Sequence, residues 1–399
     1  MVTAADPHPA QRAYLDHAAT TVLRPAAREA FLAASAVHGN PSSVHAAGRR
    51  ARAVLDEALE RIGGLLGVPR SWLIMTSGGT EADNLALRAV PRAVVARDPR
   101  RTAVAVAATD HPAVLATARS LQDGSPSLTA RFLPVDASGL LRDEAVREAL
   151  ADGAVSLVSA ALVNNETGAL QDLAALAAAA RPHGTLVHTD AVQGLGTAPL
   201  PDLADIDLMS LSGHKIGAPV GVGVLVARPE VPFAAISTGG GQQRGVRSGT
   251  LDAAQAAAFA AALEETLREK AEETARVRAL AGRLRAGIRE LDPGARFTLP
   301  EDSPQSGHIV HVVFPGADSD SLMFLLDERG VDCSAGSACS AGVTQASPVL
   351  AAMGFEGADA RGALRLSLGW TSAEDDVERA LAALPEALTR ARAVGSLFG

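Results

Sequence analysis

The sequence predicts an α/β protein: a large domain with a mostly parallel sheet of the seven-stranded type between helices, plus a smaller α+β domain. Between about residues 70 and 230, short apolar runs alternate with helix-like stretches, as in a parallel sheet covered by helices. A long helical pattern then covers residues 251–291 and leads into the smaller domain. We expect the large domain to span 22–262 and the small domain to combine 1–21 with 263–399.

Six apolar runs are the candidate strands of the large sheet. They are residues 72–76, 104–108, 157–163, 185–189, 206–211 and 221–227. Each of the first five ends in a polar cluster. Ligands bind beyond the carboxyl ends of strands in open α/β sheets, so these strand ends predict one shared site. In the smaller domain, strand signals lie at 308–314 and 363–368, and helical patterns lie around 318–330 and 373–394.

Composition excludes several classes of function. The net charge of -9 gives no basic surface for nucleic acid, and no apolar stretch reaches the roughly 18 residues that span a bilayer. Residues 1–14 lack the features of a signal peptide. The two cysteines, Cys333 and Cys339, form neither a disulfide framework nor a zinc-binding spacing. We therefore expect a cytoplasmic protein without a metal, a membrane or a direct nucleic-acid partner.

The rarity of lysine singles out one residue. Of the 36 basic residues, only Lys215 and Lys270 are lysines. Arginine stays protonated, whereas a lysine amine can lose its proton and attack a carbonyl carbon. Lys270 lies in a charged helical run, where a solvated position is the simpler interpretation. Lys215 follows an apolar strand and is the candidate for a covalent bond to a carbonyl group.

Three other strand ends carry candidate residues, each with a structural alternative. Gly79 and Thr80 stand between a strand and a helix, where free N–H groups can bind a phosphate; alternatively Thr80 is simply a helix N-cap. Asp190 could face a protonated pyridine nitrogen, or could cap the next segment. His111 could stack on a ring or move protons, or could be a capping or core histidine.

Two candidates lie in the C-terminal part. Arg365 is a charge inside an apolar strand, so we expect a carboxylate partner, from either the substrate or the protein. Cys339 lies in a run of small residues with no apolar neighbours, which favours an exposed, reactive thiol over a small buried side chain. For Cys333 we favour the structural interpretation.

Together, these motifs resemble one family along nearly the whole chain, from Tyr14 to Trp370. The sequence is similar to the NifS/IscS-like cysteine desulfurases, fold-type I enzymes of the class V aminotransferase family, in the subgroup with a longer catalytic loop. The matching motifs are YLDHAATT (14–21), GNPSS (39–43), TSGGTEADN (76–84), VNNETG (163–168), HTDAVQ (188–193), SLSGHK (210–215), RGVRSGT (244–250) and SAGSACS (334–340).

The resemblance implies an aspartate aminotransferase-like fold and a pyridoxal 5'-phosphate cofactor, which Lys215 would bind covalently. Asp190 would face the pyridine nitrogen, His111 would stack on the ring, and Gln193 would bond its phenolic oxygen. The phosphate would be held by Gly79, Thr80, Ser212 and His214, and by Thr250 of the neighbouring subunit of a homodimer. Asn165 and Arg365 would bind the carboxylate of L-cysteine.

By the same resemblance, Cys339 would take the sulfur of L-cysteine as a persulfide, leaving L-alanine. The persulfide would then pass to an acceptor protein, such as an iron–sulfur scaffold or a thiolation enzyme. Two positions depart from many relatives: Val220 replaces a lysine soon after Lys215, and Leu162 replaces a histidine. Alternative functions are a selenocysteine lyase or another class V lyase or aminotransferase, and a non-catalytic sulfur carrier that keeps the fold.

Overall fold

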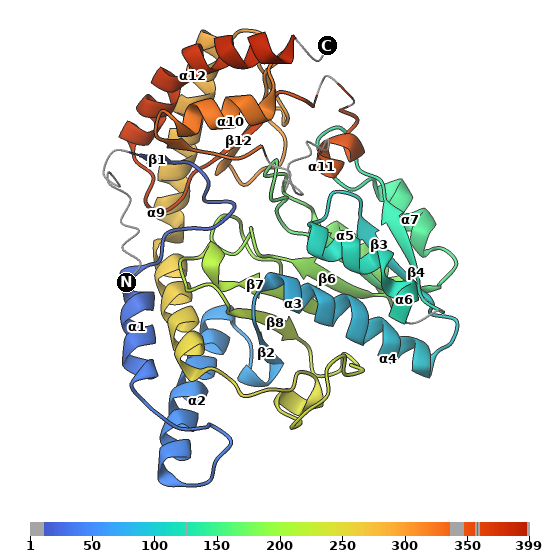
Figure 1. Ribbon diagram of the computed structural model, residues 1–399. Helices are drawn as coiled ribbons and strands as arrows, with labels where there is room; N and C mark the ends of the chain where they lie inside the picture. The colour runs from blue at the N-terminus through green and yellow to red at the C-terminus, as the bar shows by residue number, and fades with distance from the viewer. Residues whose placement is uncertain (1–11, 125–126, 336–346, 356, 358–359, 397–399) are drawn as a thin grey trace.

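A central sheet organises the larger part of this protein (Figure 1). The structure, a computed structural model, describes residues 12–124, 127–335, 347–355, 357 and 360–396. Seven described strands form the sheet: β2 (Leu73–Thr76), β3 (Ala103–Ala107), β4 (Thr129–Leu133), β5 (Val155–Ala161), β6 (Leu186–Asp190), β7 (Leu208–Ser212) and β8 (Gly223–Ala227). Their order is β2-β8-β7-β6-β5-β3-β4, and only β8 runs antiparallel to its neighbours. The predicted mostly parallel α/β fold is thereby confirmed.

Strand β4 is the one member of this sheet that the apolar runs did not predict. It lies at the edge of the sheet and pairs only with β3. Phe132 within it is 41% exposed, and Arg131 ends beside Asp152. An edge strand is solvated along one side, so its sequence mixes polar and apolar residues and lacks the continuous apolar run of a central strand.

Helices cover both faces of the large sheet. One face is covered by α3 (Gly79–Asn84), the π-helical turn η3 (Leu85–Ala89), α4 (Val90–Arg97), α5 (Pro112–Arg119) and α6 (Leu121–Gly124). The other is covered by α2 (Ala46–Leu66), α7 (Asp143–Leu150), α8 (Leu173–Ala180) and the first part of α9 (Ala253–Leu291). Strand β3 shows why: Ala105 packs into one core and Val104 into the other, because side chains alternate along a strand.

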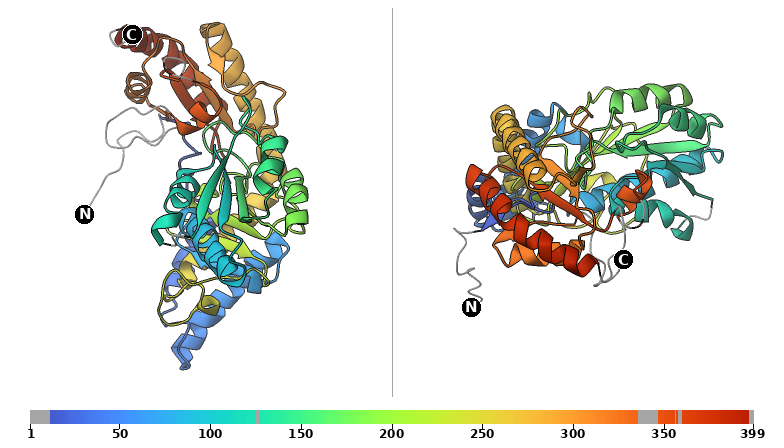
Figure 2. Two further views of the ribbon diagram at one scale, coloured as in Figure 1. Left: turned by 90° about the vertical axis from the view of Figure 1, so that its right-hand side faces the viewer. Right: turned by 90° about the horizontal axis from the view of Figure 1, so that it is seen from above.

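Helix α9 joins the larger part of the molecule to the smaller part, as Figure 2 shows. Its first half buries Phe259 and Leu263 against the large sheet, and its second half buries Leu284 and Ile288 in a separate core. Helix α1 (Pro25–Ser35) packs along its first half. The helical pattern predicted over 251–291 is therefore correct to within two residues.

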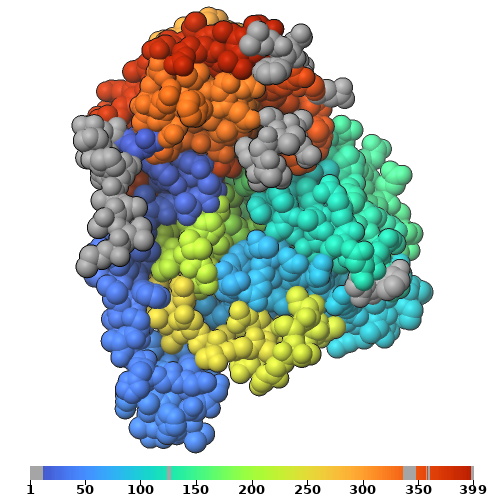
Figure 3. All heavy atoms as spheres, viewed as in Figure 1, coloured from blue at the N-terminus to red at the C-terminus, as the bar shows by residue number. Residues whose placement is uncertain are grey.

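The smaller part is a three-stranded antiparallel sheet with helices. Its elements are β9 (Arg296–Phe297), β10 (Ile309–Val313), β12 (Ala363–Ser367), α10 (Ser319–Asp327), α11 (Pro348–Ala352) and α12 (Glu374–Gly395). In addition β1 (Ala13–Tyr14) pairs in parallel with β11 (Val331–Asp332), so the N-terminal segment joins this part, as the space-filling view shows (Figure 3). None of the described helices is both long enough and apolar enough to cross a membrane.

The remaining described helical segments are short turns, three of them next to larger elements and one in the loop between β8 and α9. They are η2 (Arg70–Trp72), η4 (Arg181–His183), η5 (Gly213–Lys215) and η6 (Gln243–Gly245). Of these, η5 bears directly on function, because it follows β7 at the carboxyl edge of the sheet.

Candidate active site

The carboxyl ends of the central strands open into one cavity of about 260 Å³. Nine of the residues singled out in the sequence line it: Gly79, Thr80, His111, Asn165, Asp190, Gln193, Ser212, His214 and Lys215. They come from segments that follow β2, β3, β5, β6 and β7. The five strand ends thus meet at a single site, as the pattern predicted.

Gly78 and Gly79 shape one wall of the cavity. Helix α3 begins at Gly79 with Gly78 as its N-cap, and Gly78 has φ +153°, a conformation that side chains disfavour. A Cβ at Gly79 would lie 2.7 Å from Cγ2 of Val192. Thr80 is therefore not the N-cap that its position suggested. The first turn of α3 presents unbonded N–H groups next to Ser212 and His214, which is an arrangement suited to a phosphate.

Lys215 reaches the cavity from the turn η5. Its Nζ donates hydrogen bonds to the carbonyl oxygens of Ala18, at 2.5 Å, and Ala19, at 2.7 Å. The pKa of this amine is lowered to about 8, mainly by burial and also by the charge of Arg365, while Asp16 and Asp190 act in the opposite direction. The neutral form of the amine attacks a carbonyl group, and a substantial fraction of Lys215 is in this form near pH 7 to 8.

Asp190 is buried and His111 is half-buried, and both make the capping bonds that the structural alternatives predicted. Asp190 Oδ1 accepts a hydrogen bond from the N–H of Val192 at 2.9 Å, and His111 Nδ1 accepts one from Ala113 at 3.1 Å. Burial raises the pKa of Asp190 and lowers that of His111, although each charge offsets the shift of the other. Capping does not exclude chemistry here, because both side chains also line the cavity.

Arg365 on β12 is buried, with 4% of its surface exposed. Its partner is a carboxylate of the protein, as we expected for a charge inside an apolar strand. The Nη2 atom bonds Asp16 Oδ1 at 2.8 Å, and Nη1 bonds the carbonyl oxygen of Asn165 at 2.9 Å. The Nε atom of this guanidinium has no hydrogen-bond partner in the described part of the chain. Arg365 is therefore tied to the cavity residue Asn165 while one of its donors stays unused.

Two predicted residues that the structure describes, Arg365 and Thr250, do not line this cavity. Thr250 is exposed, in a loop held by an ion pair between Arg247 and Glu81 and outside the cavity of its own chain. Cys339 lies outside the described residues. Cys333 is half-buried, and burial raises the pKa of its thiol to about 12, which favours the structural interpretation over a reactive one.

Sequence reasoning missed two features of the site. Asp83, one turn beyond Gly79 on α3, also lines the cavity; burial and the nearby charge of Asp190 raise its pKa well above the usual range. Asp83 stands four residues after Gly79, a spacing that places both on the same face of a helix, and this spacing could have identified it from the sequence. The carbonyl groups of Ala18 and Ala19, which bind Lys215, had no signal. Lys270 also differs from its predicted solvated position: it is half-buried and donates a hydrogen bond to Leu195 O at 2.9 Å.

Comparison with known proteins gives consistent matches along almost the whole chain. The family model described as Aminotransferase class-V matches residues 13–380. An IscS-like cysteine desulfurase of Mycobacterium tuberculosis is 42% identical over 95% of this chain and 97% of its own. A cysteine desulfurase of Cereibacter sphaeroides is 38% identical over 98% of both chains. A solved NifS-like protein superposes with a TM-score of 0.86 at 30% identity, covering 95% of this chain and all of its own.

Proposed function

The chain belongs to the class V aminotransferase family, and we propose that it is a cysteine desulfurase that uses pyridoxal 5'-phosphate. The observation that carries this proposal is the meeting of Lys215, Asp190 and the Gly79 turn in one cavity. The relatives that cover nearly the whole chain are named cysteine desulfurases, which supports the reaction. Members of this family depend on pyridoxal phosphate, which supports the cofactor.

The residues present fit this cofactor. Its phosphate requires donors, which the first turn of α3, Ser212 and His214 supply. Its aldehyde requires an amine that is partly neutral, and Lys215 is one. Its protonated pyridine nitrogen requires an anion. Asp190 is a carboxyl whose pKa is raised by burial, and a positive charge beside it would favour its ionised form.

When bound, the cofactor acts as a sink for the electrons released at the substrate α-carbon. The chain's own residues then have definable tasks. Lys215 carries the proton that leaves the α-carbon, because its amine can hold or release a proton near pH 8. Asp190 would supply the negative charge for the ring nitrogen, and His111 would pack against the ring. Gln193 would donate a hydrogen bond to the ring oxygen.

Arg365 and Asn165 are the proposed holders of the substrate carboxylate. Arg365 is buried and already bonded to Asp16, yet its Nε is unpartnered in the described residues. A buried donor without a partner is costly, so an incoming carboxylate gains by satisfying it. The bond between Arg365 and the Asn165 carbonyl joins Arg365 to a residue that lines the cavity.

Cys339 is the proposed sulfur acceptor. Its thiolate forms a bond with the substrate sulfur while the substrate's carbon–sulfur bond breaks, so that L-cysteine and the enzyme thiol become L-alanine and an enzyme persulfide. The ends of the segment that carries Cys339 are both attached near the site. Ser334 exchanges backbone hydrogen bonds with Arg365, and Ser347 Oγ donates to Glu166 at 2.5 Å. The terminal sulfur then passes to an acceptor protein.

The two cysteines provide the test. Wild type is expected to form L-alanine from L-cysteine in the presence of a reductant and to carry one persulfide. Cys339→Ala is expected to keep the visible absorbance of the bound cofactor but to form little alanine, whereas Cys333→Ala stays active. Equal activity of Cys339→Ala and wild type would show that this thiol is not the acceptor, and another lyase or transaminase reaction would then be the better explanation.

A further inference from the structure

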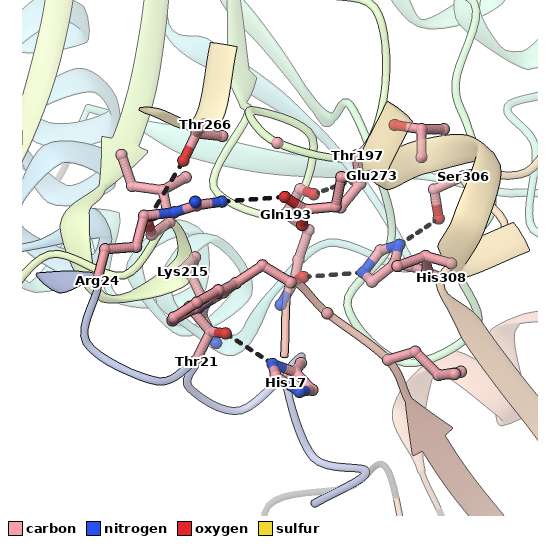
Figure 4. A pocket seen from close by; sticks show the side chains of 17 residues that line it. His17, Thr21, Arg24, Gln193, Thr197, Lys215, Thr266, Glu273, Ser306 and His308 are labelled. Atoms are coloured by element: carbon pink, nitrogen blue, oxygen red, sulfur yellow. Dashed lines mark hydrogen bonds and ion pairs between the residues drawn. The ribbon is translucent and has the colours of Figure 1, made fainter. Parts of the chain in front are cut away.

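A second, smaller cavity of about 50 Å³ adjoins the first, and Lys215 and Gln193 line both. Figure 4 shows this second cavity, where His308 from the smaller part of the molecule lies between Ser306 and Gln193. His308 is buried at 4% exposure, and Ser306 at 1%. Neither residue has a role in the function proposed above.

The hydrogen bonds along this wall permit only one arrangement of protons. Gln193 Nε2 lies 2.6 Å from the carbonyl oxygen of Ala18, which can only accept, so the amide nitrogen must face Ala18. The amide oxygen Oε1 therefore faces His308 Nε2, at 3.4 Å, and this ring nitrogen must be the donor. Burial lowers the pKa of His308 to about 3, so the ring is neutral and its Nδ1 must accept.

Ser306 completes the chain. Its hydroxyl lies 2.8 Å from His308 Nδ1 and 3.3 Å from the carbonyl oxygen of Gly168. Because Nδ1 can only accept, the hydroxyl proton goes to the histidine, and the Gly168 carbonyl already has the backbone N–H of Ser306 at 3.0 Å. Donation thus runs in one direction, from Ser306 to His308 to Gln193 to Ala18.

We propose that His308 is a positioning residue that fixes the carboxamide of Gln193 as a hydrogen-bond donor toward the cofactor. The inference rests on the proposed function, in which Gln193 bonds the phenolic oxygen of pyridoxal phosphate. With Oε1 occupied by His308, Gln193 has only N–H to offer. Without His308, Oε1 loses its donor, and only the bond to the Ala18 carbonyl then keeps the amide from turning.

The direction in which Gln193 shifts the protonation of the bound cofactor follows from the negative charge on the ring oxygen. A hydrogen bond donated by Gln193 would stabilise negative charge on the ring oxygen of the bound cofactor. It would therefore favour the form of the bound cofactor that has lost the neighbouring proton. Loss of this donor is therefore expected to raise the pH at which half of the bound cofactor has lost that proton. This pH is measured as the midpoint of the change in the visible absorbance of the bound cofactor.

Three substitutions of His308 distinguish the effect of its N–H donor from the effect of its ring shape. His308→Phe keeps the ring without a donor, and His308→Asn puts its amide beside Ser306 but is too short to reach Gln193. Both are expected to weaken binding of pyridoxal 5'-phosphate to the apoprotein roughly three- to tenfold and to raise the pH midpoint by about half a unit to one unit. His308→Gln restores a donor at the position of Nε2 and should stay within about twofold of wild type.

A double-mutant cycle tests whether His308 acts through Gln193. In a Gln193→Ala background, His308→Phe should change neither the affinity nor the midpoint further. His311→Phe is the control, since His311 is equally buried on β10 but bonds Thr298 instead; it should alter the melting temperature of the apoprotein but not the midpoint.

The outcomes distinguish this inference from the proposed function. The inference is overturned if His308→Phe and His308→Asn match wild type, if His308→Gln is as impaired as they are, or if the effect persists in the Gln193→Ala background. Failure of the wild-type apoprotein to bind pyridoxal 5'-phosphate at all would instead refute the proposed function.

Discussion

At the residue scale, the environment of each side chain accounts for its chemistry. Lys215 and Lys270 are both partly or largely buried, both have a lowered pKa, and both donate to carbonyl oxygens. They differ in what they face. Lys215 lines a cavity with Asp190 and the α3 turn, whereas Lys270 lines neither cavity described above. A reactive amine thus needs both a neutral fraction and an open space for its partner.

Covalent capture of pyridoxal 5'-phosphate by the apoprotein should follow the protonation of Lys215. The pKa of the folded amine is lowered to about 8, so the neutral fraction falls about tenfold per pH unit below that value and saturates above it. We expect the rate at which visible absorbance appears to show the same profile. Lys215→Arg should abolish capture and Lys270→Arg should preserve it. A profile that rises only near pH 10 would contradict the lowered pKa.

Arg365→Lys is expected to lower kcat/KM for L-cysteine by roughly 10- to 100-fold, mainly by raising KM. Lysine keeps the charge but lacks the planar fork of donors with which arginine reaches Asp16, the Asn165 carbonyl and a substrate carboxylate in different directions. Steady-state kinetics would measure the effect, and the cofactor absorbance should be unchanged. Arg285→Lys is the matched control, because Arg285 is also buried in the smaller part but bonds Gln305. An unchanged KM in Arg365→Lys would argue against its role.

At the element scale, the site depends on how strands end and helices begin. Strand β2 ends at Thr76, and two residues later the backbone of Gly78 takes the conformation that lets α3 start at the cavity. Glu81 on that helix accepts hydrogen bonds from the N–H of Ser77 and from Arg247. The turn is therefore held by its own helix and by the loop that carries Thr250.

Gly78→Ala tests this turn. Because φ is +153° at Gly78, alanine should destabilise the apoprotein by about 1–3 kcal/mol and weaken binding of pyridoxal 5'-phosphate severalfold. Chemical unfolding and cofactor titration would measure the two effects. Gly64→Ala on α2 is the control: Gly64 is exposed and helical, and a Cβ added there would meet no atom within 4 Å, so this change should stabilise by about 0.5–1 kcal/mol. Equal effects at both positions would contradict the role of the Gly78 conformation.

At the scale of the whole molecule, two separate cores support the domain division proposed from the sequence. One core cluster extends from Ala27 to Leu263, and another joins Ala13 and Leu15 to residues between Val277 and Ala391. We propose that these are the domains 22–262 and 1–21 with 263–399. The site lies where they meet, since Lys215 bonds the segment at Ala18 and Arg365 bonds Asn165.

The homodimer remains a proposal, and Thr250 makes it testable. Thr250 is exposed on its own chain and outside its own cavity, although the loop is held to the sheet by Gln243, which bonds both backbone groups of Met75. If Thr250 acts in the partner's site, Lys215→Ala and Thr250→Asp should each be inactive alone. Randomly mixed dimers should regain about a quarter of wild-type activity, because half of the dimers hold one intact site. No recovery after refolding the two together would contradict a shared site.

The sequence by itself determined the class of fold, the strand ends and the special lysine. These features are local: an apolar run predicts its own burial, a polar cluster predicts the end of a strand, and the rarity of lysine is a matter of counting. Gly79, Thr80, His111, Asp190 and Lys215, which these local patterns singled out, line one cavity together with four residues that the resemblance implied. The edge strand β4 was missed because half-exposed residues give no continuous apolar run.

Only the tertiary structure decided which groups are partners. Asp16 binds Arg365 across 349 positions, Lys215 binds Ala18 across 197, and His308 binds Gln193 across 115. It also made Gly78 rather than Thr80 the N-cap of α3. The physical reason is that a hydrogen bond depends on the position and direction of two groups. When these groups lie far apart along the chain, packing alone brings them together.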